Sequence, residues 1–117
     1  MDLNEAMKAH AEWKMKFRNA IAKQETLDVD TISVDTCCAL GKWLHGESKF
    51  RYGKLKSHQE CMAKHEVFHR EAGRVAKTIN AGNYAEASAM LGSNTPYRAA
   101  SNNVVVAIAA LKTESGL

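Results

Sequence analysis

Hydrophobic positions recur with a helical period along most of the chain. The first segment has its apolar residues at steps of three, four and seven, with a histidine on the same face: Leu3, Met7, His10, Phe17 and Ile21. This spacing predicts an amphipathic helix over about residues 2–25. A second segment predicts a long helix over about residues 54–81, because its core-facing positions alternate steps of three and four: Leu55, His58, Met62, His65, His69, Ala72, Ala76 and Ile79.

The last third of the chain predicts two further helices. Gly82 favours the end of the second long helix, and Asn83 followed by Glu86 resembles a capping box that opens a short helix. A turn then leads to Pro96, which suits the first position of a last helix that runs through Leu111.

A shorter helical segment lies between the two long helices. Asp35 is a suitable N-cap for a helix over about residues 36–45, and Gly46 is a suitable end. The chain has one proline and almost no alternating apolar pattern. These features predict an all-α protein: a four-helix bundle with an additional short helix, forming a single domain over residues 1–117.

Composition narrows the class of protein. The 117 residues are 45% hydrophobic and 25% charged, which is typical of one globular domain. The net charge of +3 comes from lysines and arginines spread along the chain, and this argues against nucleic-acid binding. The longest apolar run, residues 104–111, is too short to cross a bilayer, and Asp2 and Glu5 do not fit an export signal. We therefore expect a cytoplasmic protein without membrane insertion.

The three cysteines, Cys37, Cys38 and Cys61, do not suggest a disulfide framework. Their number is odd, and a disulfide between the adjacent residues 37 and 38 would be strained. Free thiols suit a reducing compartment, where an unpaired cysteine is a core residue, a redox group or a metal ligand.

Three histidines on core-facing positions, His10, His65 and His69, suggest a metal site. A buried imidazole without a partner costs roughly 1–3 kcal/mol, so one shared ion accounts for all three more economically than separate hydrogen bonds. His65 and His69 stand four residues apart and share a helix face. His58 lies roughly 10.5 Å further along the helix, too far for the same ion. Like His45, it is expected to be hydrogen-bonded or at the surface.

A thiolate is a suitable fourth ligand. Cys38 lies near the start of the predicted short helix, where free N–H groups and the helix dipole favour the deprotonated sulfur that zinc binds. Cys37 shares an i, i+3, i+7 apolar pattern with Leu40 and Leu44, which assigns it to packing and leaves Cys38 beside Gly41. Cys37 is the alternative ligand if the short helix is rotated.

Three motifs follow one another along the chain: His10-x-x-Trp13-Lys14, Cys38-x-Leu40-Gly41-Lys42-Trp43 and His65-x-x-Phe68-His69. In combination they resemble the motifs of the bacterial chemoreceptor zinc-binding (CZB) domain family. The resemblance covers nearly the whole chain, including Tyr52-Gly53, Gly82 and Tyr97-x-x-x-Ser101. It implies that Zn²⁺ is bound by His10, Cys38, His65 and His69.

Residues 65–69 read HEVFH and also match the HExxH signature of zinc metalloproteases. A metzincin would continue with glycine and histidine where this chain has Ala72 and Val75, and only Glu86 is loosely placed as a glutamate ligand. Three histidines and one cysteine form a closed tetrahedral set, whereas catalytic zinc keeps one position for water. Glu66 is then an ordinary helix residue or one that orients a ligand histidine. We expect no enzymatic activity.

The resemblance implies a sensory or regulatory zinc module. Similar domains control a chemoreceptor or a diguanylate cyclase, in cis or in trans, through zinc occupancy or oxidation of the zinc-bound thiolate by oxidants such as hypochlorous acid. They tend to form homodimers, for which the cluster Val104-Val105-Val106 is a candidate contact. Two alternatives are a small zinc hydrolase with three histidines and a water, and a metal-free thiol redox switch that uses Cys37 and Cys38.

Overall fold

Eight helices make up the computed structural model, which describes residues 1–117. In chain order they are α1 (Leu3–Ala11), α2 (Trp13–Lys23), α3 (Val29–Ile32), α4 (Ala39–His45), α5 (Glu47–Tyr52), α6 (Lys56–Asn80), α7 (Tyr84–Met90) and α8 (Pro96–Ser115). No strand is present, so the predicted all-α class is confirmed. The pattern did not predict α3 and α5, because four and six residues are too few to display a helical period.

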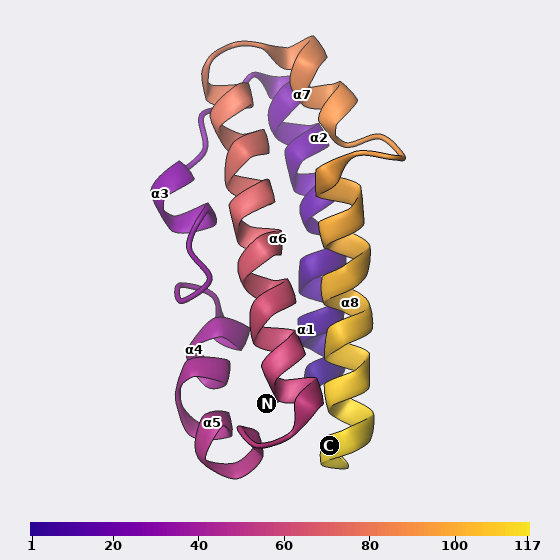
Figure 1. Cartoon of the computed structure of the whole chain (residues 1–117). Coiled ribbons are helices and arrows are strands. Elements are labelled where there is room, and N and C mark those ends of the chain that lie inside the picture. Colours follow the sequence, from indigo (N-terminus) through magenta and orange to yellow (C-terminus); the bar gives the residue numbers. More distant parts are fainter.

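Three long helical rods run side by side: α1 with α2, α6, and α8 (Figure 1). The most extensive packing is between α6 and α8, and α1 also packs against α8. Helix α7 lies at the upper end in Figure 1, while α3, α4 and α5 descend along the outer side of α6, so that both chain ends lie near the lower end. The exact four-helix arrangement stays a prediction, because α7 has only seven residues.

The predicted helix over residues 2–25 is interrupted at Glu12. Glu12 keeps right-handed helical angles (φ −74°, ψ −13°), so α1 and α2 continue nearly in line as one rod. The amide of Met15 donates to the carbonyl of Glu12 at 3.1 Å, a tighter bond than that of a regular α-helix. The interruption comes two residues after His10, close to the predicted metal site.

Helix α4 begins later than predicted, because its N-cap is Cys38 and not Asp35. The sulfur of Cys38 accepts a weak hydrogen bond from the amide of Gly41 at 3.4 Å. The carboxylate of Asp35 instead lies 2.9 Å from Nε2 of His45, at the far end of the same helix. Gly46 ends α4 as predicted.

Capping at the other helices follows the sequence in part. Asn83 is the N-cap of α7, but its side chain makes no capping bond, so the predicted capping box is wrong. Thr95 caps α8 by accepting from the amide of Arg98 at 3.2 Å, and Pro96 begins that helix as predicted. The start of α6 has no side-chain cap of its own; the carboxylate of Glu114 on α8 accepts from the amide and hydroxyl of Ser57.

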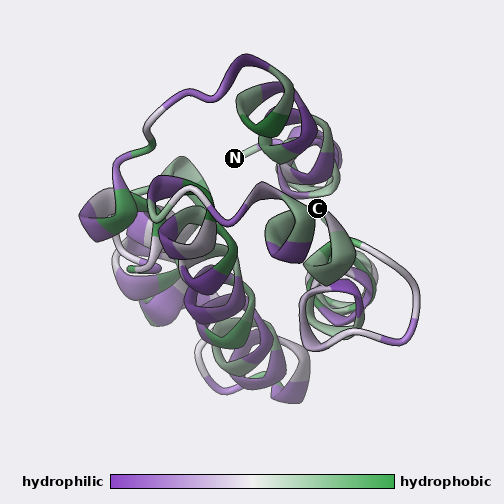
Figure 2. Ribbon diagram, turned by 90° about the horizontal axis from the view of Figure 1, so that it is seen from above, coloured by the Kyte–Doolittle hydropathy of each residue, from purple (hydrophilic) through white to green (hydrophobic).

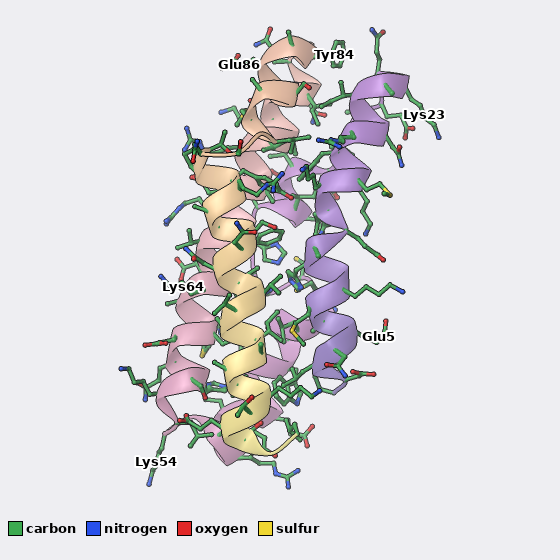
Figure 3. All side chains as sticks on the ribbon, turned by 90° about the vertical axis from the view of Figure 1, so that its right-hand side faces the viewer. Glu5, Lys23, Lys54, Lys64, Tyr84 and Glu86 are labelled. Atoms are coloured by element: carbon green, nitrogen blue, oxygen red, sulfur yellow. The ribbon has the colours of Figure 1, made fainter.

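The helices carry both hydrophobic and hydrophilic residues around their axes. Viewed end-on, hydrophilic and hydrophobic residues alternate on each rod (Figure 2), and labelled charged side chains such as Glu5, Lys23 and Lys64 project away from the ribbon (Figure 3). No helix combines the length and the apolar character that a membrane-spanning segment needs.

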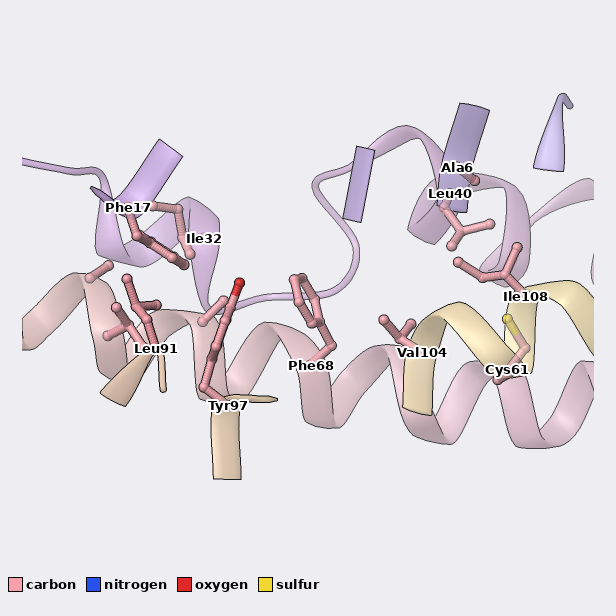
Figure 4. Close-up of a cluster of buried hydrophobic side chains, with 14 of the residues drawn as sticks. Ala6, Phe17, Ile32, Leu40, Cys61, Phe68, Leu91, Tyr97, Val104 and Ile108 are labelled. Atoms are coloured by element: carbon pink, nitrogen blue, oxygen red, sulfur yellow. The ribbon is translucent and has the colours of Figure 1, made fainter. Parts of the chain in front are cut away.

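The core lies between the rods and reaches the predicted metal site. Phe17, Phe68 and Tyr97 form its aromatic part (Figure 4), with ring centroids 5.7 Å apart for Phe17 and Tyr97 and 6.0 Å apart for Phe68 and Tyr97. The ring of Phe68 also lies 5.3 Å from that of His10 and 5.4 Å from that of His69. The hydrophobic core therefore borders these two imidazoles directly.

Candidate metal centre

The structure brings together the side chains of the four predicted ligands, His10, Cys38, His65 and His69. His10 comes from α1, Cys38 from the N-cap of α4, and His65 and His69 from successive turns of α6. Their candidate ligand atoms all lie within 4.8 Å of one another. The three imidazoles are buried and the thiol is half-buried, and a surface pocket reaches His10 and Cys38.

The distances within the cluster suit one small cation. The sulfur of Cys38 lies 3.2 Å from Nε2 of His65, 3.5 Å from Nε2 of His69 and 3.9 Å from Nε2 of His10. Nε2 of His65 lies 3.1 Å from that of His10 and 3.0 Å from that of His69. Tetrahedral zinc with Zn–N and Zn–S bonds of about 2.0–2.3 Å places its donor atoms roughly 3.3–3.7 Å apart. The donor set therefore fits zinc in number and type, and its separations, from 3.0 Å to at most 4.8 Å, span that range.

Backbone carbonyls set the tautomers of two of these imidazoles. Nδ1 of His10 lies 2.7 Å from the carbonyl oxygen of Ala6, and Nδ1 of His69 lies 2.9 Å from that of Ile32. A carbonyl oxygen only accepts, so each Nδ1 carries the proton and each Nε2 presents a lone pair to the centre. These bonds orient both rings as metal ligands.

Hydrogen bonds alone cannot account for the close contacts between the donor atoms of the cluster. Five contacts of 3.0–3.9 Å join the Cys38 sulfur and the three Nε2 atoms. Only the Cys38 thiol and Nε2 of His65 have a proton to offer there, because the protons of His10 and His69 are on Nδ1. Nδ1 of His65 is itself buried without a partner. A cation that accepts all four lone pairs resolves the conflict, so the residues present fit a metal ion.

Burial keeps the imidazoles neutral. It lowers the pKa of His65 to about 3, with a further contribution from the neighbouring His69 and His10, and it is the main cause of the lowered pKa of those two residues. Neutral imidazole is the form that binds metals, so these rings need not lose a proton first at neutral pH.

The pKa of the Cys38 thiol is raised, whereas its position at a helix start alone would lower it. Burial raises its pKa, and the amides of Gly41 and Leu40 lower it by a smaller amount. In the absence of a cation the sulfur is therefore protonated at neutral pH. A zinc ion at the centre would bind the thiolate and reverse this preference.

Gly41 allows the segment before α4 to lie against the site. A Cβ atom built on Gly41 would overlap the carbonyl oxygen of Asp35 and would lie 3.2 Å from Cε1 of His65. No other residue fits this position without displacing either the backbone before α4 or the imidazole. On the outer side, the carboxylate of Asp35 lies 2.9 Å from Nε2 of His45 and connects the two ends of the same segment.

A comparison with protein families matches residues 10–76 to the family described as the chemoreceptor zinc-binding domain. The chain belongs to the chemoreceptor zinc-binding (CZB) domain family. The matched range begins at His10 and contains all four residues of the cluster. The CZB domain is a regulatory, sensory domain associated with chemoreceptor signalling. No curated protein and no solved structure is significantly similar to the chain.

Near the CZB cluster, Cys37 lies differently from its predicted position, and Glu66 has the first of its two predicted roles, that of an ordinary helix residue. Cys37 is exposed, so its predicted packing role is wrong, and Cys38 takes the position that faces the histidines. Glu66 is exposed and makes no side-chain hydrogen bond or ion pair, so it does not orient a ligand histidine. The carbonyls of Ala6 and Ile32 do so instead. Backbone acceptors leave no signal in the residue types, and only the i, i−4 relation of Ala6 to His10 could have indicated one of them.

The other two histidines lie as predicted. His58 is buried, and its Nε2 lies 2.9 Å from the hydroxyl oxygen of Ser48. His45 is paired with Asp35 at the surface. Neither belongs to the cluster.

Proposed function

We propose that this CZB protein is a zinc-binding regulatory module in which His10, Cys38, His65 and His69 hold one Zn²⁺. The observation that carries the proposal is the convergence of three imidazole nitrogens and one sulfur, with two of the rings oriented by backbone carbonyls. The module is a single cytoplasmic domain over residues 1–117. Its four-helix bundle consists of α1–α2, α6, α7 and α8, with α4 carrying the cysteine ligand.

The four proposed ligands would connect α1, the start of α4 and the middle of α6 through one metal ion. Bound zinc supplies a Lewis acid that keeps the Cys38 sulfur deprotonated and joins it to three imidazoles. His10 then holds α1, Cys38 holds the start of α4, and His65 with His69 hold the middle of α6. Loss of the Cys38 donor would release α4 while the α6–α8 packing stays intact.

The proposed signal is zinc availability, oxidation of Cys38, or both. A thiolate attacks the chlorine of hypochlorous acid and releases hydroxide; water then displaces chloride from sulfur, which leaves a sulfenic acid. Sulfur in that state is a weaker donor than a thiolate. The released α4 would change the output of a chemoreceptor or a diguanylate cyclase domain, in cis or in trans, through a homodimer.

The donor set favours a regulatory site over a catalytic one. Four protein donors would complete a tetrahedron around zinc and leave no open position for a zinc-bound water. A hydrolase would require Cys38 to withdraw from 3.2 Å and 3.5 Å contacts with the α6 histidines. We therefore propose that the module has no catalytic activity of its own.

Metal analysis of matched cysteine variants tests the proposal. The wild-type chain and Cys37→Ser should each contain close to one zinc per chain, whereas Cys38→Ser should lose zinc in competition with a chelator that the wild type withstands. Cys37→Ser is the matched control because it removes the adjacent thiol, which is exposed. Loss of zinc from Cys37→Ser with retention in Cys38→Ser would show that the assigned ligand set is wrong.

A further inference from the structure

Positive charge is concentrated in one short segment, residues 42–56, which we call the basic tip. It holds five lysines or arginines and one glutamate, a formal net charge of +4: Lys42, Glu47, Lys49, Arg51, Lys54 and Lys56. The whole chain carries +3, so the remaining residues are slightly acidic together. This local concentration corrects the prediction that the charge is evenly dispersed.

Helix α5 presents an aromatic side chain at the centre of this charge. Ser48 on α5 is buried, with its hydroxyl 2.8 Å from the Trp43 carbonyl oxygen, and Tyr52, one turn later, is half-buried. Successive helix residues are about 100° apart, so Phe50 points away from the side that these two residues bury. Phe50 is 95% exposed, and Lys49 and Arg51 flank it on either side.

The cations around Phe50 are not neutralised by carboxylates, although the guanidinium of Arg51 lies over the Tyr52 ring, 5.7 Å from its centroid. None of Lys42, Lys49, Arg51 and Lys54 takes part in an ion pair. Only Lys56 is paired, with Glu60 at 3.8 Å, and both of those side chains are exposed. Helix α5 lies at the lower end of the molecule in Figure 1, and Lys54 extends from that end in Figure 3.

The basic tip protrudes and has no groove of its own. No residue of 42–56 lines the five surface cavities that lie along the rest of the chain. A protruding phenylalanine needs either a pocket in a partner or a deformable surface. Lysine is depleted in protein–protein interfaces, whereas lysine and arginine around an exposed aromatic residue are typical of peripheral membrane contacts. The composition therefore favours a lipid surface.

We propose that the basic tip docks on an anionic lipid surface. Phe50 enters the boundary between headgroups and acyl chains, and Lys42, Lys49, Arg51 and Lys54 lie over the lipid phosphates. This contact is peripheral and needs no membrane-spanning helix. It does not depend on the metal, because none of these residues belongs to the His10–Cys38–His65–His69 cluster.

Vesicle co-sedimentation of the full chain tests the proposal. We expect binding to vesicles of equal parts phosphatidylglycerol and phosphatidylcholine, no binding to pure phosphatidylcholine, and a decline with added salt. The double variant Lys49→Glu with Arg51→Glu should lower the vesicle partition coefficient by roughly 30-fold or more. Each basic residue near an anionic surface raises that coefficient about fivefold, and two such residues are lost. Phe50→Ser should weaken it separately.

A charge-matched control is Arg18→Glu with Lys77→Glu. Both of these residues are exposed and unpaired, and both lie outside the basic tip. The control should partition like the wild type to within a small factor, with helical circular dichroism and zinc content unchanged in all variants.

Three results would overturn the proposal. The first is no binding to anionic vesicles at low ionic strength. The second is an equal loss of binding in the control variant, which would show that only net charge matters. The third is retention on immobilised polyglutamate without binding to vesicles, which would assign the basic tip to an acidic protein.

Discussion

The imidazole of His69 donates from Nδ1 to the carbonyl oxygen of Ile32 at 2.9 Å. Its other nitrogen lies 3.5 Å from the sulfur of Cys38, so one ring connects α3 with the start of α4. Helix α3 also approaches α6 closely, because a Cβ atom on Gly73 would lie 2.9 Å from Cα of Ser33. The position of residues 29–45 on α6 therefore depends on the orientation of His69.

Zinc removal should loosen α1, α3 and α4 while α8 stays folded. The reason is that the ligands lie on α1, α4 and α6, whereas α8 is held by apolar packing of Val104, Ile108 and Leu111. Hydrogen exchange followed by mass spectrometry, with and without a chelator, should show faster exchange in residues 3–11 and 29–45 and little change in residues 104–111. Complete loss of helical circular dichroism on chelation would contradict this expectation.

Gly41→Ala should weaken zinc binding by at least about fivefold. The added Cβ would overlap the carbonyl oxygen of Asp35 and press on the His65 ring, and overpacking of this kind typically costs about 1–3 kcal/mol. Competition with a chromophoric chelator measures the effect. Gly92→Ala is the matched control, since its Cβ would come no closer than 3.3 Å to another atom, the Ala89 carbonyl oxygen. Equal affinity in the two variants would refute the proposed role of Gly41.

The two buried histidines of α6, His58 and His65, should behave differently on substitution. His65→Ala should lose zinc. His58→Ala should keep its zinc and lose at least about 1 kcal/mol of unfolding free energy, because a buried ring is removed and Ser48, which still donates to the Trp43 carbonyl oxygen, loses its other partner. Metal analysis together with urea unfolding separates the two effects, and loss of zinc from His58→Ala would exclude the proposed ligand set.

Oxidation should select Cys38 over Cys61 in the zinc-loaded protein. Cys61 is fully buried, and burial raises the pKa of its thiol to about 12, so almost no reactive thiolate is present there. A substoichiometric pulse of hypochlorous acid on the Cys37→Ser background, which removes the exposed competing thiol, should modify Cys38 first by mass spectrometry. Equal rates of Cys38 oxidation with and without zinc would argue against a thiolate switch and would favour zinc occupancy as the signal.

Acidification should destabilise the metal-free protein below pH 6.5. Burial lowers the pKa values of His10, His65 and His69 below the 6.5 of an unfolded histidine, and that of His65 reaches about 3. The folded state then binds fewer protons than the unfolded state, so this contribution is present above pH 6.5 and is lost as the pH falls towards 3. Urea midpoints in chelator should therefore decline across this range, and His65→Gln should reduce the decline.

Most of the helices were predictable because their signals are local. The steps of three and four that predicted α6 depend only on the residues of α6, and Thr95 with Pro96 marks the start of α8 wherever that helix packs. The prediction missed α3, which has only four residues although Asp28 caps it locally, and α5, which is held by contacts such as that of Ser48 with His58. It also failed for the exposed valine cluster, since Val104 is fully buried and only Val106 is largely exposed, at 67%.

For the metal centre, sequence spacing was sufficient to place His65 and His69 on one face of a helix, because i and i+4 positions are neighbours in any α-helix. The folded chain showed that Cys38 and not Cys37 faces the histidines: both residues precede α4, and the path of this extended backbone beside α6 depends on tertiary packing. Packing likewise brought His10 of α1 to within 3.1 Å of His65. Packing also placed the carbonyl oxygen of Ile32 within hydrogen-bond distance of His69. Distances between segments far apart in the chain depend on tertiary contacts, and local residue patterns do not reveal them.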